Sequence, residues 1–329
     1  MQATIPVLLK QGHQVIGVDN FFRYGEIERQ RPYTFLRGDL SEESFVKSIF
    51  VQHKIDYVIQ AAARIFGVRG FHQYPADILL CDTRLHANVL RAAHEHGVKR
   101  VTYISSSMVY ERTETAPTKE DDVDQMRIPL TDYGLSKLVG ERLSKAFWTQ
   151  YGLPYTIWRP FNIITPFERA EKEPGVAHVF ADFLEKILVQ RQNPMEILGD
   201  GNQIRSFTWI YEVADAIGRF SFDPRTENTI FNLGQYDAND KSEAVTMKEL
   251  AQKIFDKGKQ HGIIPADEQL QFTHRIDDLI KNTDVKFRIP DPSRARHIFG
   301  WTTVIHLDEA LDHCVQQMIQ DGLIKVSSS

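Results

Sequence analysis

One stretch near the middle of the chain constrains the fold more than any other. The apolar run of residues 101–104 ends in three serines, residues 105–107, and is followed by the segment Tyr133-Gly134-Leu135-Ser136-Lys137. Such a run is typical of a buried parallel strand, and open α/β sheets carry their chemistry at the carboxyl ends of their strands. We therefore expect the serines at that edge of a sheet, beside the segment that carries Tyr133.

Tyr133 and Lys137 are four residues apart, so on a helix they project from the same face. A phenol is a poor base at neutral pH because its ordinary pKa is about 10, and a nearby ammonium lowers that pKa. The pair can then take a proton from a sugar or alcohol hydroxyl while hydride leaves the same carbon. A serine at the strand end can orient the same oxygen. An ordinary surface helix is the alternative interpretation, since this spacing also arises by chance.

The composition and charge of the chain indicate which kinds of partner and which cellular location to expect. The 329 residues are 42% hydrophobic and 25% charged, which is typical of a globular protein. The formal charge of -5 gives no basic patch, so nucleic acid is not an expected partner. No apolar run approaches the roughly 20 residues that span a bilayer, and no signal sequence is evident, so we expect no membrane and a cytoplasmic location. Cys81 and Cys314 lack metal-ligand spacing, and no metal is expected.

The first residues predict a helix, residues 3–13, and then a strand, residues 14–19, that ends in Asp19. In a dinucleotide-binding unit such an acid binds the adenosine ribose about 20 residues after a glycine-rich turn. A carboxylate there repels a 2′-phosphate, which favours NAD over NADP, although Arg23 leaves NADP open. The sequence holds no glycine-rich turn before this strand. We expect that a strand and such a turn are encoded upstream of Met1; a chain that truly lacks them is the alternative.

Several motifs fall in the order typical of one family. They are residues 100–110, the Tyr133–Lys137 segment and Arg159-Pro160-Phe161-Asn162. Together they resemble the extended short-chain dehydrogenase/reductase family, in particular its NAD-dependent nucleotide-sugar epimerase and dehydratase branch, from about Gln11 to Trp301. The resemblance implies an α/β fold, a Rossmann-like doubly wound parallel sheet with a smaller mixed α/β substrate domain. Residues 1–160 would bind NAD, and residues 161–329 would form mainly the substrate-binding domain, interleaved with the first.

The resemblance also implies roles for particular residues. The catalytic residues would be Ser106, Tyr133 and Lys137. The cofactor-binding residues would be Asp19, Asp39, Leu40, Ala61, Ala62, Ala63, Tyr133, Lys137 and Pro160. The substrate-binding residues would be Ser107, Met108, Asn162, Arg205 and Arg288, with the two arginines on a diphosphate, onto whose oxygens a guanidinium forks.

Several of these residues have a plain structural alternative. Asp39 could cap a helix, the alanines could simply pack closely, Asn162 could be a turn residue and Arg288 could form a surface ion pair. Glu212 stands where relatives of this family usually have an aspartate, and we interpret it as structural.

The residues that follow Ser106 narrow the reaction. Family dehydratases carry aspartate and glutamate there, decarboxylases carry a glutamate at the second position, and 3,5-epimerases carry a cysteine; this chain has Ser107 and Met108. The resemblance therefore implies NAD-dependent epimerisation, most simply at C4, of a nucleoside-diphosphate sugar through a transient keto intermediate. A dehydratase or reductase of the same family and a degenerate NAD-binding protein remain alternatives. The resemblance also implies a homodimer through a four-helix bundle, built from the helix over residues 76–96 and the helix carrying Tyr133.

Overall fold

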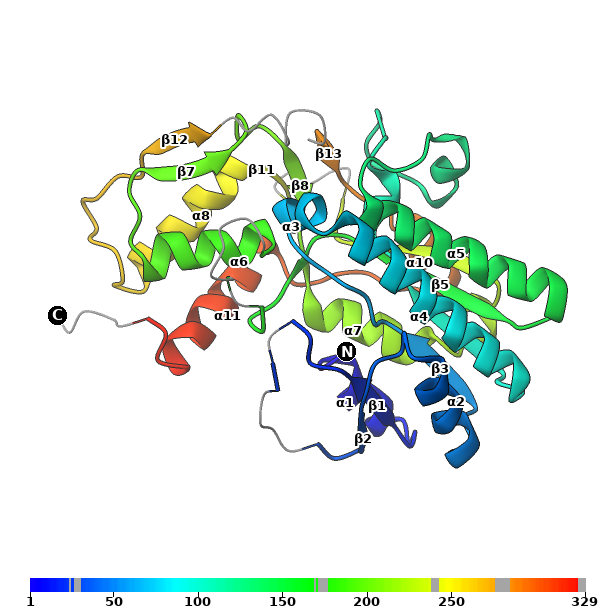
Figure 1. Cartoon of the computed structure of the whole chain (residues 1–329). Coiled ribbons are helices and arrows are strands. Elements are labelled where there is room, and N and C mark those ends of the chain that lie inside the picture. Colours follow the sequence, from blue (N-terminus) through cyan, green and yellow to red (C-terminus); the bar gives the residue numbers. More distant parts are fainter. Residues whose placement is uncertain are drawn as a thin grey trace.

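The computed structural model describes residues 1–23, 25–26, 31–168, 170, 177–237, 243–275 and 285–324. The C-terminal tail, residues 326–329, lies outside the described residues. The N-terminal end of the chain lies beside α1 and β1 (Figure 1).

Parallel strands form the core of the first lobe. Strand β1 (Ile16–Asp19) pairs with β2 (Thr34–Arg37), and a second sheet has the order β3 (Tyr57–Gln60), β4 (Arg100–Ile104), β5 (Tyr155–Pro160) and β10 (Thr229–Leu233). Every one of these pairings is parallel. Ile157 and Trp158 of β5 are fully buried, as expected for strands that are covered on both faces.

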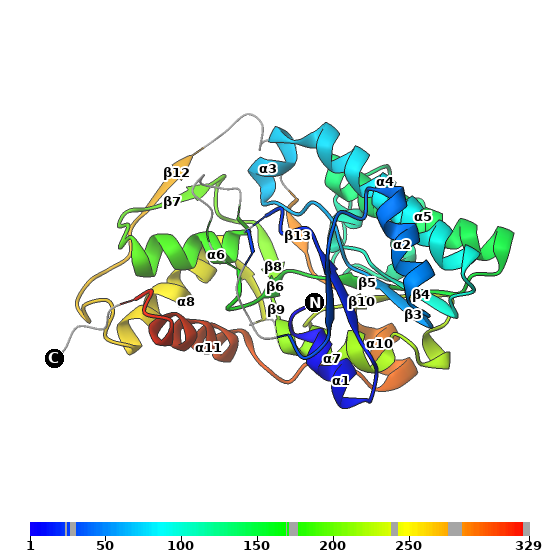
Figure 2. The ribbon, with the colours of Figure 1, turned by 60° about the horizontal axis from the view of Figure 1, so that its bottom comes forward.

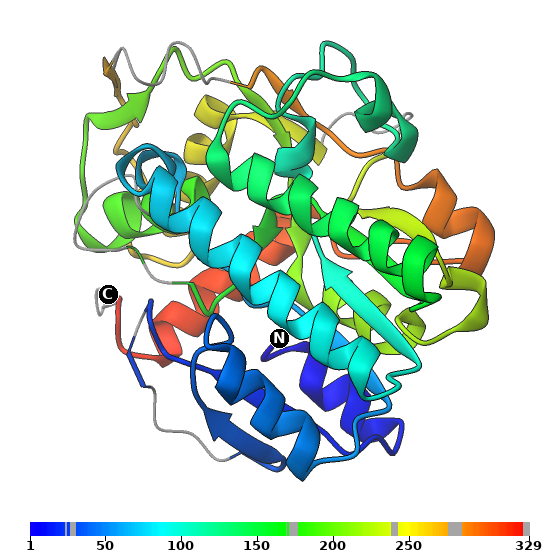
Figure 3. The same ribbon diagram turned by 45° about the vertical axis from the view of Figure 1, so that its right-hand side comes forward.

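Helices cover both faces of this sheet. One face carries α2 (Glu43–Gln52), α4 (Pro75–Glu95) and α5 (Asp132–Tyr151), and the other carries α1 (Thr4–Lys10), α7 (Ile210–Phe220) and α10 (Ser293–Phe299). Figure 2 shows the first three helices on one side of the strands and the other three on the opposite side. Figure 3 shows α4 and α5 running side by side across the front of the lobe. The predicted doubly wound α/β fold is confirmed.

Strands β1 and β3 each have one edge without a described partner strand. Among the described strands, β1 is hydrogen-bonded only to β2, and β3 only to β4. Val18 of β1 and Val58 of β3 nevertheless pack against the same core cluster, which is centred on α2 and α4. A doubly wound sheet of the classic order has one further parallel strand between two such neighbours. The strand that we expect upstream of Met1 therefore stays a prediction.

The second lobe combines short sheets with longer helices. Its strands are β6 (Ile163–Ile164), β7 (Met195–Leu198), β8 (Ile204–Ser206), β9 (Thr208–Trp209), β11 (Ala244–Thr246), β12 (Phe272–Arg275) and β13 (Phe287–Arg288). They pair as β6-β9, β7-β12 and β11-β8-β13, with only β11-β8 antiparallel. Its helices are α6 (Val179–Leu184), which continues as the π-helical turn η3 (Glu185–Val189), α8 (Met247–Gln260) and α11 (Leu307–Gln320). The helices share one apolar core with β6, β7, β9 and β11, and β12 packs against it through Phe272.

Later segments of the chain return to the first lobe, because β10, α7 and α10 all pack in its core with Trp158. The division at residues 160 and 161 stays a prediction. Short helices complete the structure: α3 (Val68–Gln73), η1 (Ser107–Tyr110), η2 (Glu120–Gln125) and η4 (Pro224–Thr226).

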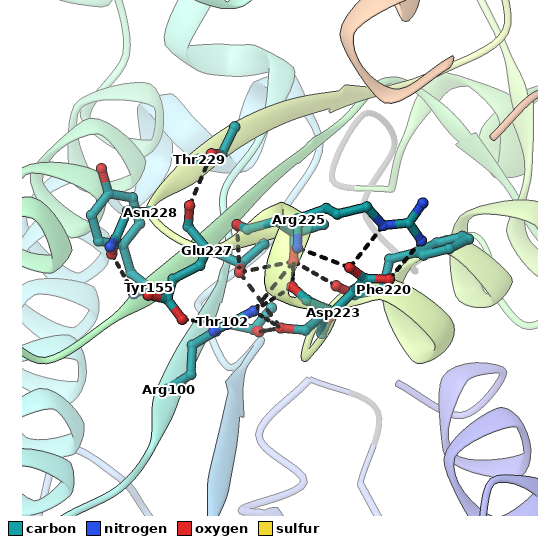
Figure 4. Close-up of polar contacts among 12 residues, drawn as sticks. Arg100, Thr102, Tyr155, Phe220, Asp223, Arg225, Glu227, Asn228 and Thr229 are labelled. Atoms are coloured by element: carbon teal, nitrogen blue, oxygen red, sulfur yellow. Dashed lines mark hydrogen bonds and ion pairs between the residues drawn. The ribbon is translucent and has the colours of Figure 1, made fainter. Parts of the chain in front are cut away.

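A buried polar cluster holds the carboxyl end of α7 beneath the sheet (Figure 4). Arg100, at the start of β4, is 5% exposed and donates hydrogen bonds to the carbonyl oxygen of Asp223 at 2.8 Å and to Glu227 Oε2 at 2.6 Å. The Thr226 hydroxyl donates to the carbonyl oxygen of Phe220 at 2.7 Å. The last carbonyl groups of a helix have no partner within the helix, and the Thr226 hydroxyl satisfies one of them. The Arg100 cation lies beyond this end of α7 and complements the helix dipole.

We predict that Arg100→Met lowers the free energy of unfolding by about 2–3 kcal/mol, because it leaves buried acceptors without their charged donor. Urea denaturation measures the change. Arg225→Met is the matched control, since Arg225 belongs to the same cluster but is exposed and pairs with its neighbour Asp223; it should hardly move the unfolding midpoint. Equal shifts for both variants would contradict this role of Arg100.

Candidate active site

Three predicted catalytic residues meet at the carboxyl end of β4. The turn η1 begins directly after Ser106, whose Oγ accepts a hydrogen bond from the Met108 amide at 3.2 Å. Tyr133 lies in the first turn of α5, and Lys137 follows one turn later. The Lys137 ammonium donates to the carbonyl oxygen of Ile104 at 3.0 Å and lies 5.7 Å from the centre of the Tyr133 ring. The serines therefore lie at the predicted strand end, beside the predicted helix.

The Tyr133 ring is packed into an apolar cluster and is only 6% exposed. The ring of Phe71, from α3, stacks on it with 4.6 Å between the ring centres and 6° between their planes. Ile78 and Met108 belong to the same cluster. The orientation of the phenol is thus set by packing as well as by the helix.

Our expectation for the pKa of Tyr133 is wrong for this structure. Burial raises the pKa of Tyr133, and the Asp82 carboxylate raises it further, while a hydrogen bond with Ser106 and the charges of Arg288 and Arg23 lower it. The Lys137 ammonium is directed to the carbonyl oxygen of Ile104, at 3.0 Å. Burial lowers the pKa of Lys137 itself, against the opposing charges of Asp82 and Glu141.

Asp82 is a buried carboxylate of α4 that the sequence analysis missed. It has no exposed surface, and it accepts hydrogen bonds from the Arg64 amide at 2.8 Å and from the Ser136 hydroxyl at 3.0 Å. It therefore ties the loop after β3 to α5, next to Lys137. A signal was available, because Asp82 lies on the helical stripe of the buried residues Ile78 and Val89.

His86 lies one turn after Asp82 and is also buried. Its Nε2 lies 2.7 Å from the Tyr103 hydroxyl, and its Nδ1 lies 3.2 Å from Gln60 Nε2. Burial lowers its pKa and the charge of Lys137 lowers it further, so the ring is neutral. His86 is thus a buried histidine that packs between α4 and the sheet, with both ring nitrogens beside polar partners.

A buried ion pair anchors α5 to the sheet. Arg159 at the end of β5 and Glu141 of α5 are both essentially without exposed surface, and they form two bonds, Nη2 to Oε2 at 2.6 Å and Nε to Oε1 at 2.8 Å. Ser105 donates to the same Glu141 Oε1 at 2.6 Å. Arg159 also donates to the Glu120 carbonyl oxygen at 2.8 Å and to the Tyr110 hydroxyl. The helix that carries Tyr133 is therefore fixed to the ends of β4 and β5.

The candidate cofactor residues gather at the carboxyl ends of β1 and β2. Asp19 is exposed, and its Oδ1 accepts a hydrogen bond from the Phe21 amide at 2.8 Å. Asp39 accepts from the Ser41 amide at 2.8 Å and from Asn20 Nδ2 at 2.9 Å. Asp39 does not cap α2, whose N-cap is Glu42, so the helix-cap alternative is wrong.

Arg23 follows β1 and lies 3.4 Å from Glu168 Oε1. The same carboxylate lies 2.7 Å from His178 Nδ1. Although burial alone would raise the pKa of Glu168, His178 and Arg23 hold it at about 2. The Arg23 guanidinium lies on Glu168, and the Asp19 carboxylate is exposed at the end of β1. A carboxylate at this position binds ribose hydroxyls and repels a 2′-phosphate, which fits NAD rather than NADP.

The other cofactor candidates line the neighbouring strand ends. Leu40 packs against the core of the first lobe. The half-buried residues Ala61, Ala62 and Ala63 follow β3, and half-buried Pro160 closes β5.

The candidate substrate residues come from both lobes. Arg288 of β13 is the register partner of Arg205 of β8, so the two side chains project from the same face. Arg205 Nη1 donates to the carbonyl oxygen of Ile204 at 2.9 Å. Asn162 has a positive φ of 33°, and its Nδ2 donates to the carbonyl oxygens of Ser206 at 2.8 Å and Arg288 at 3.3 Å. Its amide thus joins β8 and β13.

Ser107 and Met108 are buried in η1. Glu212 accepts hydrogen bonds from the amides of Val304 and Ile305, the latter at 3.0 Å, which agrees with a structural role.

The described residues were also compared with the requirements of a metal site and of a membrane-spanning helix. Within the described ranges, no three histidine, cysteine or acidic residues are grouped so that they could hold a metal ion. Of the helices that the structure describes, none combines the length and the apolar character needed to cross a bilayer.

The chain is similar to known families and proteins. The model of the NAD dependent epimerase/dehydratase family matches residues 2–234. UDP-glucuronate 4-epimerase of Thermodesulfobacterium geofontis is 29% identical over 94% of this chain and 89% of its own length. GDP-L-fucose synthase 1 of Arabidopsis thaliana is 26% identical over 83% of this chain and 80% of its own. The dTDP-D-glucose 4,6-dehydratase of Bos taurus is 26% identical over 88% and 75%.

Solved structures agree with the fold. A UDP-glucose 4-epimerase of Thermotoga maritima, solved with UDP-glucose, has a TM-score of 0.80 at 24% identity, covering 97% of this chain and 94% of that one. The Thermus thermophilus UDP-glucose 4-epimerase in complex with NAD has a TM-score of 0.80 at 20% identity, covering 96% and 94%. At these identities the likeness concerns the fold alone.

Since the family model covers well over half of the chain, the chain belongs to the NAD dependent epimerase/dehydratase family. This confirms the predicted extended short-chain dehydrogenase/reductase relationship. It also confirms NAD as the cofactor of the family to which the chain belongs. The roles of the individual residues, the reaction and the substrate are matters of proposal.

We predict that Asp82→Asn moves the pH profile of kcat to lower pH. The Asp82 carboxylate raises the pKa of Tyr133, so removing it lowers that pKa and shifts the acidic limb downward. It also raises the pKa of Lys137, so the basic limb should move in the same direction. Steady-state rates across the pH range measure both limbs. Asp56→Asn, at an exposed carboxylate paired with Lys99, should leave them unchanged; an alkaline shift in Asp82→Asn would refute this electrostatic effect.

Proposed function

We propose that the protein catalyses NAD-dependent epimerisation, at C4, of a nucleoside-diphosphate sugar through a transient keto intermediate. The convergence of Ser106, Tyr133 and Lys137 at the end of β4 carries this proposal. The neighbouring positions support epimerisation over loss of water, because Ser107 and Met108 provide no carboxylic acid. The nearby carboxylates Asp82 and Glu111 are buried, and both accept hydrogen bonds from other protein groups.

In this proposal each side chain has a definite task. Tyr133 takes the proton of the sugar 4-hydroxyl as hydride leaves C4, and it returns the proton when hydride comes back to the other face of the keto sugar. Ser106 hydrogen-bonds the reacting oxygen, and Lys137 supplies positive charge beside the site and binds the nicotinamide ribose. Bound NAD would supply the hydride chemistry at C4, in both directions. The oxidation and the reduction thus cancel, and the net change is the configuration at one carbon.

Binding would be divided between the lobes. Asp19 would bind the adenosine ribose, with Asp39, Leu40, the three alanines after β3 and Pro160 lining the cofactor. Arg205 and Arg288 would hold the diphosphate, with Asn162 fixing the strands beneath them. This division follows the proposed NAD-binding residues 1–160 and the mainly substrate-binding residues 161–329. The similarity to a UDP-glucuronate 4-epimerase supports a nucleotide sugar as the substrate class.

A dehydratase or reductase of the same substrate class is the second candidate, favoured by the similarity to dTDP-D-glucose 4,6-dehydratase and GDP-L-fucose synthase. Proton NMR of the products separates the candidates. An epimerase interconverts two sugars without net use of NAD, a dehydratase releases a keto-deoxy sugar, and a reductase consumes reduced cofactor. Failure to turn over any nucleotide sugar would favour a binding protein without activity.

We also propose a homodimer through α4 and α5. Large apolar side chains are exposed on these two helices, namely Leu80, Trp148 and Tyr151, at 61%, 39% and 47%. Such side chains are favoured in the contact between two helix pairs. The cytoplasmic location stays a prediction.

We predict that Tyr133→Phe lowers kcat by about 10²–10⁴-fold or more, because it removes the proposed base. The change deletes one hydroxyl and keeps the stack on Phe71, so the fold and NAD binding should persist, as circular dichroism and calorimetry can check. Activity on UDP-glucose and UDP-glucuronate is the readout. A variant that keeps most of the parent's activity would show that Tyr133 is not the base.

We predict that Arg205→Ala raises KM for the nucleotide sugar by roughly 30-fold while kcat changes little. Losing a charged hydrogen bond to a phosphate costs about 2 kcal/mol, and the diphosphate is remote from the reacting carbon. Initial rates over a range of sugar nucleotide concentrations separate the two constants. An unchanged KM with a collapsed kcat would place Arg205 at the chemistry instead.

A further inference from the structure

The helix that carries Tyr133 begins at a cap with an additional partner. Thr131 is the N-cap of α5, and its Oγ1 accepts the amide hydrogen of Gly134 at 3.1 Å. The hydroxyl of Thr131 donates its own hydrogen to Glu111 Oε1 at 2.9 Å, and the Thr131 amide donates to Glu111 Oε2 at 2.8 Å. One carboxylate, only 5% exposed, thus takes both donors of the capping residue and fixes the direction of its hydroxyl.

Helix α8 shows the ordinary form of the same arrangement. Its N-cap Thr246 accepts the Glu249 amide at 3.1 Å, and Glu249 Oε2 accepts the amide and hydroxyl of Thr246 at 2.7 and 2.9 Å. This is a capping box, in which the third residue of the helix supplies the carboxylate. In α5 the third residue is Gly134, and the carboxylate comes from Glu111, twenty residues before Thr131 and outside the helix.

The reason for this exchange lies in how closely η1 approaches the helix. A Cβ atom on Gly134 would lie 2.7 Å from the carbonyl oxygen of Met108 and 2.9 Å from Glu111 Oε2. The third helical position therefore cannot carry a glutamate, and glycine there lets η1 pack directly on the first turn of α5. Glu111 directly follows η1 and, as the structure shows, replaces the missing carboxylate from the other side of the contact.

Glu111 consequently connects the two parts of the candidate active site. The turn η1 begins directly after Ser106, and the turn that Glu111 caps contains Tyr133, between Thr131 and Gly134. We call the two hydrogen bonds from Thr131 to Glu111 the clamp. Without the clamp, the hydroxyl of Thr131 can rotate and the first amides of α5 lose a fixed acceptor. The position of the Tyr133 hydroxyl relative to Ser106 then depends on a frayed turn. Misplacing a reacting group by about 1 Å can cost on the order of 10²-fold in rate.

We propose that Glu111 is a positioning residue, which holds Tyr133 against Ser106 by clamping the first turn of α5 to η1. The inference rests on the proposed function, because it takes Tyr133 as the proton-transferring group. It adds a residue to which neither the resemblance nor the comparisons assign a role.

Glu111→Gln tests the clamp. The amide keeps the shape of the side chain, but its NH₂ faces one of the two Thr131 donors, so one hydrogen bond is lost. We expect kcat to fall about 10- to 100-fold, with KM within threefold of the parent value. Hydrogen–deuterium exchange of the amides of residues 133–136 should become about five- to tenfold faster. Thr131→Ser keeps both donors and should retain kcat within threefold, whereas Thr131→Val should behave like Glu111→Gln.

Glu249→Gln is the matched control, since it makes the same change in the same hydrogen-bond pattern at α8. It should accelerate exchange at the start of α8 and leave kcat unchanged. A fall in kcat equal to that of Glu111→Gln would mean that any weakened cap slows the enzyme, and the inference would be overturned.

The rates are measured with UDP-glucose and UDP-glucuronate, using whichever the parent converts. If Tyr133→Phe keeps its activity, the proposed function itself fails. If Tyr133→Phe is inactive but Glu111→Gln retains the parent kcat, the proposed function stands and the clamp is overturned. Unchanged exchange of residues 133–136 in Glu111→Gln also overturns it, and this measurement needs no substrate.

Discussion

The ion pair between Arg159 and Glu141 is the interaction on which the candidate active site depends most. Burying an unpaired charge costs several kcal/mol, so such a pair persists only if its geometry is good and its remaining donors and acceptors are satisfied. Here two short bonds join the partners, and Ser105 and the Glu120 carbonyl complete them. Removing either partner would leave a bare charge in the core, at about 3–5 kcal/mol. Because the pair joins α5 to β4 and β5, that loss would fall on the site itself.

Lys137, one helical turn before Glu141, is a second buried charge at the candidate active site. Lys137 is buried, and the negative charges of Asp82 and Glu141 both favour its protonated form. Glu141 is already bound by Arg159, and Asp82 adds a second negative charge beside Lys137. The same carboxylate raises the pKa of Tyr133. Asp82 therefore keeps Lys137 protonated and makes Tyr133 harder to ionise.

The sequence was sufficient for the elements with long, regular patterns. The helix over residues 76–96 and the strand over residues 101–104 lie within one residue of α4 and β4. The place of Ser106 was predictable because it follows a strand end, and the place of Lys137 beside Tyr133 because the two are one helical turn apart. Glu111 was not, because its partner Thr131 is twenty residues away. The pKa of Tyr133 was mispredicted since burial beneath Phe71 depends on tertiary packing, which spacing along a helix does not reveal.

The stack of Phe71 on Tyr133 couples access to chemistry. The phenol that is proposed to move the proton is almost shielded from solvent, and its cover belongs to α3, a helix of six residues. Access of a sugar to that hydroxyl therefore depends on where the ring of Phe71 lies. Under the proposed function, the same cover would exclude water from a ketone held between the two half-reactions.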